Sequence, residues 1–311
     1  MGPLRVATRA SALARWQAGE VARLLRLVDP GLDVELVITD TVGDRRLDVA
    51  ITELGGQGVF VKEVQAAVLD GRADLAVHSA KDLPSLTAPG LHLIAVPTRG
   101  DPRDALVGAG WDDLGPGAVV ATGSVRRRAQ LAWLRPDLSF VGLRGNIATR
   151  LDRCPPGGAV VVAAAALERL GMAHRAHHVF SPSVLLPQVG QGAMAVECRG
   201  GDRRVAELLA DIDDPLAHRA VDAERGFLAR LGSGCDLPVG AWATVDGDTI
   251  RVEAMVASID GHVLLKGHAS GPACDPAALG ASLADRLVVD AGGAALLEDG
   301  FVVPAHAQGV P

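Results

Sequence analysis

The sequence predicts an α/β protein with a small α+β region at its C-terminal end. Through the first two thirds of the 311 residues, short apolar segments that fit strands alternate with longer helical patterns, which is typical of α/β folds. Beyond about residue 213, three segments alternate apolar and polar residues and a helical pattern follows them. This second pattern is typical of an antiparallel sheet covered by a helix.

Composition and charge argue against several classes of protein. A hydrophobic content of 49% and a charged content of 22% are those of an ordinary globular protein. The net charge of −7 argues against general binding to nucleic acid or anionic membranes, and 3% aromatic residues with no tyrosine make a stacking platform for bases unexpected. No apolar run reaches the roughly 18 residues of a membrane span, and the N-terminus has no apolar signal region. We therefore expect a cytoplasmic protein.

The chain up to about residue 98 is predicted to form a first α/β unit. Ser11 suits the N-cap of the first helix and Arg9 precedes it, so this helix start is a candidate anion site. A solvated arginine beside an ordinary cap explains the local pattern equally well. Gly55–Gly58 lacks the Walker lysine and the G-x-G-x-x-G spacing, and is more simply a flexible turn. The expected strands are 4–8, 34–38, 75–77 and 91–96, and the expected helices run from 11 to about 25 and from 61 to 69.

The third of these strands, Leu75–Val77, ends in a cluster of polar and ionisable residues. Pro84 then prevents a regular continuation, because it has no N–H to donate. An apolar strand that ends in such groups is how α/β proteins present chemistry at the carboxyl edge of a sheet. The chain has 3 lysines against 27 arginines, so a lysine beside an aspartate invites a functional interpretation; a solvated surface ion pair is the alternative. The cluster consists of His78, Ser79, Lys81 and Asp82.

A second α/β unit is predicted from about residue 99, and each of its three strands leads into arginine. Because the ends of parallel strands meet at one edge of a sheet, we expect a cleft that receives several carboxylates or phosphates, which guanidinium groups bind in a bidentate fork. For any single basic cluster, a solvated helix face is the alternative. The expected strands are 118–121, 140–143 and 159–164, and the arginines after them are Arg126, Arg127, Arg128, Arg144, Arg150 and Arg169.

A Pro- and Gly-rich crossover, Leu185–Gly192, precedes a further apolar strand at Ala193–Glu197. Because this strand follows a complete α/β unit, we expect it to return to the first sheet and make the first domain discontinuous. The last region begins with a helix from Pro215 and ends with strands at 241–245, 251–258 and 262–267 and a helix over 276–289.

The four cysteines lie far apart, without a C-x-x-C pair, so neither a metal site nor a disulfide framework is expected. Cys235 differs from Cys154, Cys198 and Cys274 because it lies in a Gly-Ser-Gly loop. Such a cysteine is accessible and suits a nucleophile or an attachment point. A buried small hydrophobe is the plainer interpretation for most cysteines.

Six motifs occur along the chain in one order, and together they resemble the porphobilinogen deaminase (hydroxymethylbilane synthase) family. The resemblance runs from about Leu4 to the end of the chain. Each motif alone is modest, but six in order make a chance similarity improbable. The motifs are Ala7–Ser11, His78–Pro84, Gly123–Arg127, Leu143–Asn146, Val189–Ala193 and Gly232–Cys235.

The resemblance implies two α/β domains of the periplasmic-binding-protein kind and a small α+β domain that carries a cysteine. The corresponding boundaries are 1–98 and 193–212 for the first domain, 99–192 for the second, and 213–311 for the third. It also implies a monomeric transferase of porphyrin (haem) biosynthesis that joins four porphobilinogen molecules head to tail, with loss of ammonia, into a linear tetrapyrrole. Each pyrrole carries an acetate and a propionate, which accounts for arginines gathered in an acidic protein.

The resemblance also implies roles for individual residues. Cys235 carries a dipyrromethane cofactor through a thioether, Asp82 is the main catalytic group, and Lys81 assists it; no metal is implied. The implied cofactor ligands are Ser79, Lys81, Asp82, Thr122, Ser124, Arg126, Arg127, Arg144 and Gly145, and the implied substrate ligands are Arg9, Ser11, Gln17, Arg144, Arg150 and Arg169.

One departure from the family and two alternative functions stand beside this interpretation. Many relatives carry lysines near the glycine-rich loop where this chain has Glu53 and Gln57, so this protein must do without them or use Arg45, Arg46 or Lys62. An anion- or solute-binding protein would explain the arginines without chemistry, but it would require neither Asp82 nor the Cys235 loop. A thiol enzyme would need a histidine base, for which His78 is the candidate.

Overall fold

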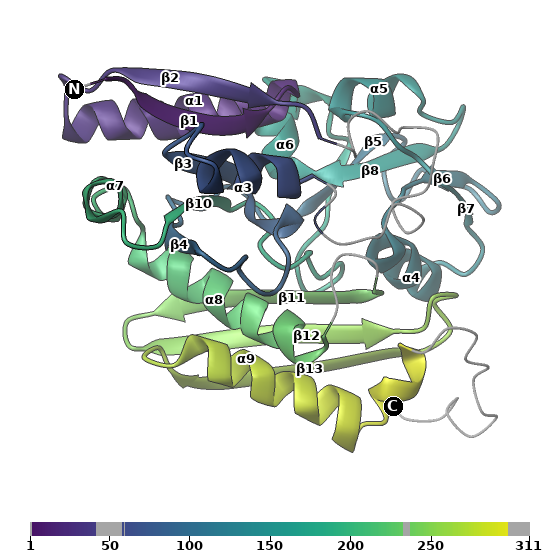
Figure 1. The fold of residues 1–311 in the computed structure, drawn as a ribbon. Coiled ribbons are helices and arrows are strands. Elements are labelled where there is room, and N and C mark those ends of the chain that lie inside the picture. The colour runs from purple at the N-terminus through teal and green to yellow at the C-terminus, as the bar shows by residue number, and fades with distance from the viewer. Residues whose placement is uncertain (1, 42–57, 59, 233–236, 298–311) are drawn as a thin grey trace.

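The computed structural model describes residues 2–41, 58, 60–232 and 237–297, which form three sheets with helices packed on them (Figure 1). The α/β class with a C-terminal antiparallel sheet is confirmed. Within the described residues, no helix is both long and apolar enough to span a membrane.

The first sheet has the strand order β2-β1-β3-β10-β4. Strand β1 pairs in parallel with β2 and β3, whereas β10 is antiparallel to β3 and β4. Its strands are β1 (Leu4–Arg9), β2 (Val34–Thr39), β3 (Leu75–Ser79), β4 (Leu91–Ala95) and β10 (Met194–Arg199), and its helices are α1 (Ala12–Val28), α3 (Lys62–Leu69) and α7 (Arg203–Ala210). The strand after the long crossover thus returns to the sheet in which the chain began.

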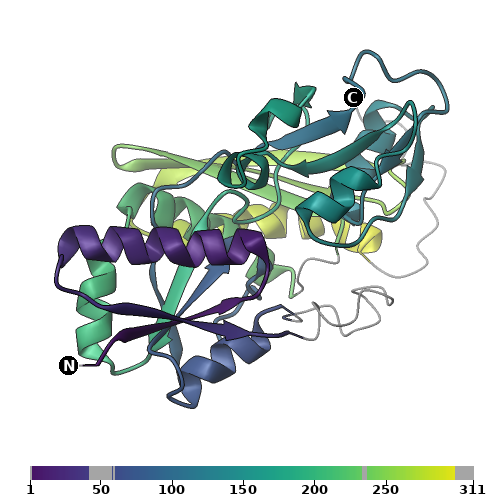
Figure 2. The same ribbon diagram turned by 90° about the horizontal axis from the view of Figure 1, so that it is seen from above.

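Alternating side chains of the first sheet separate two cores. Val77 and Val196 face α1 and α7, where they pack with Val21 and Leu209. On the other face, Ala76 packs against α3. Figure 2 shows α1 lying along this sheet. Both faces of the first sheet are therefore covered by helices.

The second sheet has the order β7-β6-β8-β5-β9, again with parallel strands on one side and antiparallel pairing on the other. Two of these strands, β5 and β9, were not predicted from the sequence. Strand β5 begins at a buried aspartate within a polar segment, and β9 has two residues. The elements are β5 (Asp104–Gly108), β6 (Val119–Ala121), β7 (Ser139–Val141), β8 (Ala159–Ala163), β9 (His178–Val179), α4 (Val125–Leu134), α5 (Ile147–Asp152) and α6 (Ala164–Arg169).

The third sheet is antiparallel, in the order β11-β12-β13, and α8 and α9 cover one face of it (Figure 1). The two helices approach so closely that a Cβ on Gly280 would lie 1.9 Å from the carbonyl oxygen of Ala223, so glycine is required there. The elements are β11 (Val239–Asp246), β12 (Thr249–Ala257), β13 (Leu264–Pro272), α8 (Pro215–Arg230) and α9 (Pro276–Asp285), with short turns η2 (Ala80–Asp82), η3 (Ala173–Arg175), η4 (Arg286–Asp290) and η5 (Gly293–Leu296).

Glu224 of α8 connects the third sheet to both segments that cross between the other two sheets. Its buried carboxylate accepts hydrogen bonds from Arg99 (2.6 and 3.1 Å), from the Gly190 N–H (2.7 Å) and from the Ala243 N–H of β11 (2.8 Å). A charged acceptor with four donors is well satisfied despite its burial. The two crossing segments are therefore held together beside the site described next.

Candidate active site

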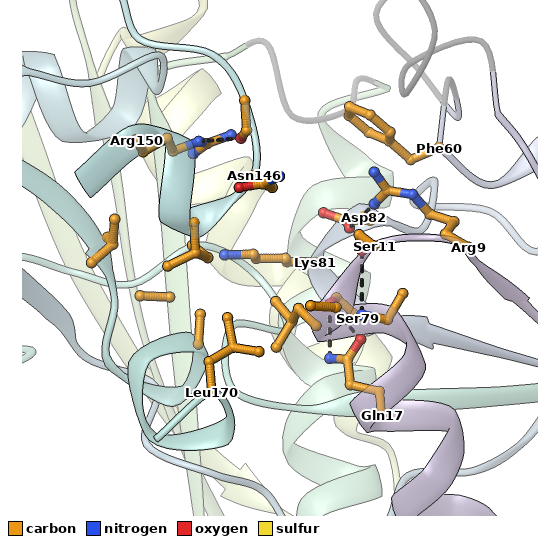
Figure 3. A pocket seen from close by; sticks show the side chains of 18 of the residues that line it. Arg9, Ser11, Gln17, Phe60, Ser79, Lys81, Asp82, Asn146, Arg150 and Leu170 are labelled. Carbon is orange, nitrogen blue, oxygen red and sulfur yellow. Dashed lines mark hydrogen bonds and ion pairs between the residues drawn. The ribbon is translucent and has the colours of Figure 1, made fainter. Parts of the chain in front are cut away.

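A cavity of about 360 Å³ lies between the first and second sheets, at the ends of their strands. Among the described residues that line it, five carry lysine or arginine charges and one carries a carboxylate, that of Asp82. Figure 3 shows Lys81 and Asp82 between Arg9 on one side and Arg150 on the other. The lining also includes apolar side chains, among them Val77, Val162, Leu170 and Met172. The cationic residues of this lining are Arg9, Lys81, Arg127, Arg144 and Arg150.

Asp82 reaches the cavity because β3 ends at Ser79 and the tight turn η2 follows at once. Its carboxylate lies 3.7 Å from the guanidinium of Arg9, which ends the neighbouring strand β1. The Arg9 guanidinium carbon also lies 4.2 Å from the centre of the Phe60 ring, a cation–π distance. Asp82 is thus a partly exposed anion in a positively charged surrounding.

Lys81 adjoins Asp82 and extends toward the second sheet (Figure 3). Loss of solvation, reinforced by the positive charge of Arg127, lowers the pKa of Lys81 to about 8, while Asp82 and Asp104 oppose the shift. The Nζ atom donates to the side-chain oxygen of Gln191 at 3.3 Å. Lys81 can therefore change its charge close to neutral pH.

Two polar residues of α1 and β3 form a rigid edge of the cavity. The side chains of Gln17 and Ser79 are joined by contacts of 2.9 and 3.1 Å, shown as dashed lines in Figure 3. Ser11 caps α1, accepting from the Ala14 N–H at 3.3 Å, as its position in the sequence predicted. All three predicted residues therefore line the cavity, together with Arg9.

On the second-sheet side, Arg150 of α5 donates from Nε to the Gly145 carbonyl at 2.7 Å. Its pKa is lowered to about 10 by loss of solvation and by the nearby charges of Arg127, Arg144 and Arg9, against the attraction of Asp82. Gly145 has φ +118°, a conformation that favours glycine, and an added Cβ would lie 3.0 Å from Thr149. The cations of this wall repel one another, so the cavity favours an anionic occupant.

Arg126 and Arg127 hold Asp104, the first residue of β5. Arg126 Nη2 lies 2.7 Å from Oδ2, and Arg127 Nη2 lies 2.7 Å from Oδ1. Although burial opposes ionisation, these two cations keep the pKa of the Asp104 carboxyl well below its usual range. Arg127 still lines the cavity, but Arg126 is 1% exposed and does not. The structure therefore gives Arg126 a buried ion pair where the sequence suggested a cofactor ligand.

Three other predicted residues lie beside the large cavity without lining it. Thr122 accepts from the Ser124 N–H at 3.2 Å, and Ser124 caps α4 by accepting from the Arg127 N–H at 3.4 Å. Both thus shape the turn that presents Arg127. Arg169 donates to the Gly192 carbonyl at 2.6 Å and lines a smaller void that it shares with Lys81.

Sequence reasoning missed several residues of the site. Asp104 received no role in the site, although an aspartate at the start of a strand is a natural partner for an arginine pair. Asn146 and Gln191 lie in the motifs that carried the family resemblance, but neither received a role; Asn146 caps α5 and lines the cavity. Phe60 carried no signal, because a lone aromatic before a helix is usually core.

The donor set fits a dipyrromethane, whose acetate and propionate groups require cations. Five cationic side chains face one carboxylate in the described lining, and guanidinium groups match carboxylates geometrically. Cys235, the predicted attachment point, lies outside the described residues, as do Arg45, Arg46, Glu53 and Gln57. Lys62 begins α3. The fit therefore rests on the cavity alone.

Comparisons with known proteins agree with this geometry. Residues 4–207 match the family model described as "Porphobilinogen deaminase, dipyromethane cofactor binding domain", and residues 218–288 match "Porphobilinogen deaminase, C-terminal domain". A porphobilinogen deaminase of Roseiflexus castenholzii is 48% identical over 299 residues, covering 94% of this chain and 98% of that protein. One of Syntrophotalea carbinolica is 47% identical over 290 residues, covering 92% of each.

The solved structures that are similar to this one include the methionine binding protein MetQ. The match has a TM-score of 0.43 and 16% identity and covers 73% of this chain and 94% of MetQ, and this likeness is too distant to bear on function. The two family matches and the two relatives span nearly the whole chain. The chain belongs to the porphobilinogen deaminase family.

Proposed function

We propose that this chain is a hydroxymethylbilane synthase that joins four porphobilinogen molecules into a linear tetrapyrrole and releases ammonia at each addition. The observation that carries the proposal is the cavity at the strand ends, with five cations and a single carboxylate in its described lining. Each substrate pyrrole carries two carboxylates, which the cations of the cavity can bind. It also carries the amine that must leave, which the single carboxylate can bind.

Substrate carboxylates would bind to the arginines of the two walls. Arg9 extends from the first sheet, and Arg144 and Arg150 follow strand β7 of the second. Ser11, Gln17 and Ser79 would add hydrogen bonds from the edge that α1 and β3 form. Arg169 lies at the adjoining void, from which it would contact a longer chain. Guanidinium groups keep their charge at any working pH, so binding would not depend on their titration.

Asp82 is the proposed catalytic residue. When porphobilinogen loses ammonia, a cation conjugated with the pyrrole nitrogen remains, and attack on it by the terminal pyrrole of the growing chain forms a second cation that must then lose a proton. A carboxylate at the pyrrole N–H stabilises both cations and can accept protons. The apolar side chains of Val162, Leu170 and Met172 in the lining would limit the water around the substrate pyrrole. The attraction between the carboxylate and the cation would then be stronger than in water.

Lys81 is proposed to act beside Asp82. With its pKa near 8, it is protonated at neutral pH and able to bind a carboxylate or to donate a proton to departing ammonia. The nearby charge of Arg127 makes the protonated form of Lys81 unfavourable while the cavity holds no anion. A bound substrate carboxylate would offset this repulsion, so protonated Lys81 favours the substrate-bound state.

The dipyrromethane cofactor is proposed to be attached to Cys235. When bound, it supplies the pyrrole terminus onto which substrate units are added. Lys81, Arg127, Arg144, Ser79 and Gly145 would hold its carboxylates and N–H groups from the cavity wall. Thr122 and Ser124 would act through the turn that begins α4.

We propose domains at 1–98 with 193–212, at 99–192 and at 213–311. We also propose that the protein is a cytoplasmic monomer and that porphobilinogen is its small-molecule partner, with no nucleic acid or membrane.

A solute-binding protein with the same arginines would bind the substrate without changing it. Ammonia release distinguishes the two functions: the purified chain should release one ammonia per porphobilinogen consumed, and binding without ammonia release would contradict the proposal.

A further inference from the structure

We propose that Gln191 is a positioning residue that holds Lys81 in place by tying its ammonium group to Asp104 of the second sheet. The inference deepens the proposed function, on which it rests, because Lys81 there handles substrate carboxylates. Gln191 lies in the segment that returns from the second sheet to the first, and its side chain is completely buried.

The amide of Gln191 has its two ends in opposite surroundings. Its Nε2 atom donates to the Pro102 carbonyl at 2.7 Å and to Asp104 Oδ1 at 2.8 Å. Its Oε1 atom accepts from Lys81 Nζ at 3.3 Å and from Arg127 Nη2 at 3.4 Å. The acceptors gather at the nitrogen and the donors at the oxygen, so the orientation of the amide is fixed by its partners.

The backbone of Gln191 is held as firmly as its side chain. Its carbonyl accepts from Arg99 Nε at 3.0 Å, and the preceding Gly190 N–H donates to Glu224 at 2.7 Å. Gly192 has φ +86°, and a Cβ there would lie 2.4 Å from the Gly100 carbonyl oxygen. The residue therefore cannot shift without disturbing both crossing segments.

These contacts make a continuous path from the catalytic turn to the second sheet. Lys81 belongs to η2, which follows β3 of the first sheet, whereas Asp104 begins β5 of the second. Gln191 contacts both Lys81 and Asp104, and Arg127 donates hydrogen bonds to both Asp104 and Gln191. A change in the separation of the two sheets would therefore change the position of the Lys81 ammonium group even when no substrate is bound.

An amide is the side chain that this position requires. A carboxylate would face Asp104 and the Pro102 carbonyl without a proton to donate, and an apolar side chain would leave Asp104 and Lys81 each without a partner that they now have. The charged groups around Lys81 are Asp82 in its own turn, Arg126 and Arg127 from α4, and Asp104 from β5; Arg169 of α6 lines the adjoining void.

The test replaces Gln191 by methionine, which has a similar length but no acceptor oxygen, in the full chain with its cofactor. Removing an acceptor from an ammonium group disfavours the protonated form, so the alkaline fall in kcat/KM should move to lower pH. A hydrogen bond to a charged group corresponds to a shift of about one pH unit. The kcat should fall as well, because Lys81 loses its fixed direction.

Gln130→Met provides a matched control. Gln130 is also a buried amide, and it exchanges hydrogen bonds with the Leu186 backbone at 3.0 and 2.8 Å, away from Lys81. This variant should lose stability but keep the pH profile of the original chain. If Gln191→Met shows the same unmoved profile, the inference is overturned.

Two further comparisons keep the test decisive. If the methionine variant does not fold, Gln191→Asn replaces it: this shorter amide cannot span from Asp104 to Lys81, so the alkaline fall should again move to lower pH, and an unmoved profile overturns the inference. In the Lys81→Met background, Gln191→Met should leave the pH profile unchanged, since its effect passes through Lys81. Absence of ammonia release by the original chain would instead contradict the proposed function and is a separate outcome.

Discussion

The carboxylate of Asp82 lies 3.7 Å from the guanidinium of Arg9, and the two side chains come from the ends of neighbouring strands. Strand β1 ends at Arg9 and β3 ends three residues before Asp82. Because the strands are parallel, their carboxyl ends meet at one edge and bring the two charges together. Arg9 thus places a positive charge beside the Asp82 carboxylate at the edge of the cavity.

Asp82→Asn should lower kcat by at least about 100-fold, a typical loss when a positioned acid or base is removed. The amide keeps the shape but not the charge, so KM should change less than kcat. Steady-state assays of ammonia release provide the measurement. Asp137→Asn is the control, because Asp137 forms an ion pair with Arg135 at the protein surface. Near-normal turnover by the Asp82 variant would transfer the catalytic role to another group.

Arg144→Leu should weaken the handling of substrate carboxylates while leaving the fold intact, because Arg144 lines the cavity in the segment between β7 and α5. Loss of one charged hydrogen bond should cost about 1.5–3 kcal/mol at the affected step. The measurement is kcat/KM at low substrate together with the midpoint of thermal unfolding. A variant with unchanged kcat/KM would show that Arg144 binds no substrate.

Arg127→Leu should behave differently, because Arg127 is both a cavity residue and a partner of buried Asp104. Removing one partner of a buried ion pair typically costs about 3–5 kcal/mol. Urea unfolding should therefore reveal a loss of stability for Arg127→Leu that Arg144→Leu lacks. Equal stability of the two variants would contradict the role given to Asp104.

The Asp104 carboxyl predicts how stability depends on pH. Its pKa is depressed in the folded state, so the unfolded chain binds more protons and stability rises with pH. This contribution is present above the ordinary aspartate pKa of about 4 and disappears as the pH falls below it. Asp104→Asn should be less stable at pH 7 and show a flatter decline toward pH 3. An unchanged slope in urea titrations would exclude Asp104 as its source.

Lys81 predicts a limit to activity at alkaline pH. Its pKa near 8 means that the proton is present at pH 7 and mostly lost at pH 9. If the ammonium group binds substrate, kcat/KM should fall with a midpoint near pH 8. Lys81→Arg, which stays protonated throughout this range, should remove that fall even where its overall rate is lower. A midpoint that persists in Lys81→Arg would assign the titration to another group.

Strand ends were the part of the fold that the sequence predicted well. Apolar runs such as Leu75–Val77 and Ala159–Ala163 are buried throughout, and the polar residues that follow them mark the edge of each sheet. Strand β5 was missed because its partner is distant and it begins at a charged residue. Burial of Asp104 depends on Arg126 and Arg127, and a pairing that joins β5 to α4 is set by tertiary structure.

The site residues also divide into those that the sequence predicted and those whose role depends on tertiary packing. Arg9, Ser11, Gln17 and Asp82 were predicted from the family resemblance and line the cavity. Arg126 differs because the direction of a side chain on α4 depends on how the helix packs, and the packing turns it inward toward Asp104. Gln191 was overlooked because an amide carries no charge pattern, and its importance comes entirely from what surrounds it.

We propose that the cations of the cavity bind a carboxylate-bearing primer that is permanently attached to Cys235. Intact mass spectrometry of the freshly purified, active chain tests it most directly, with Cys235→Ser as the matched control. We predict a mass greater than that of the sequence by two linked pyrrole units, stable to denaturation and to thiol reductant, and absent from the Cys235→Ser variant, which should also form no tetrapyrrole. An active chain with the unmodified mass of its sequence would contradict the account.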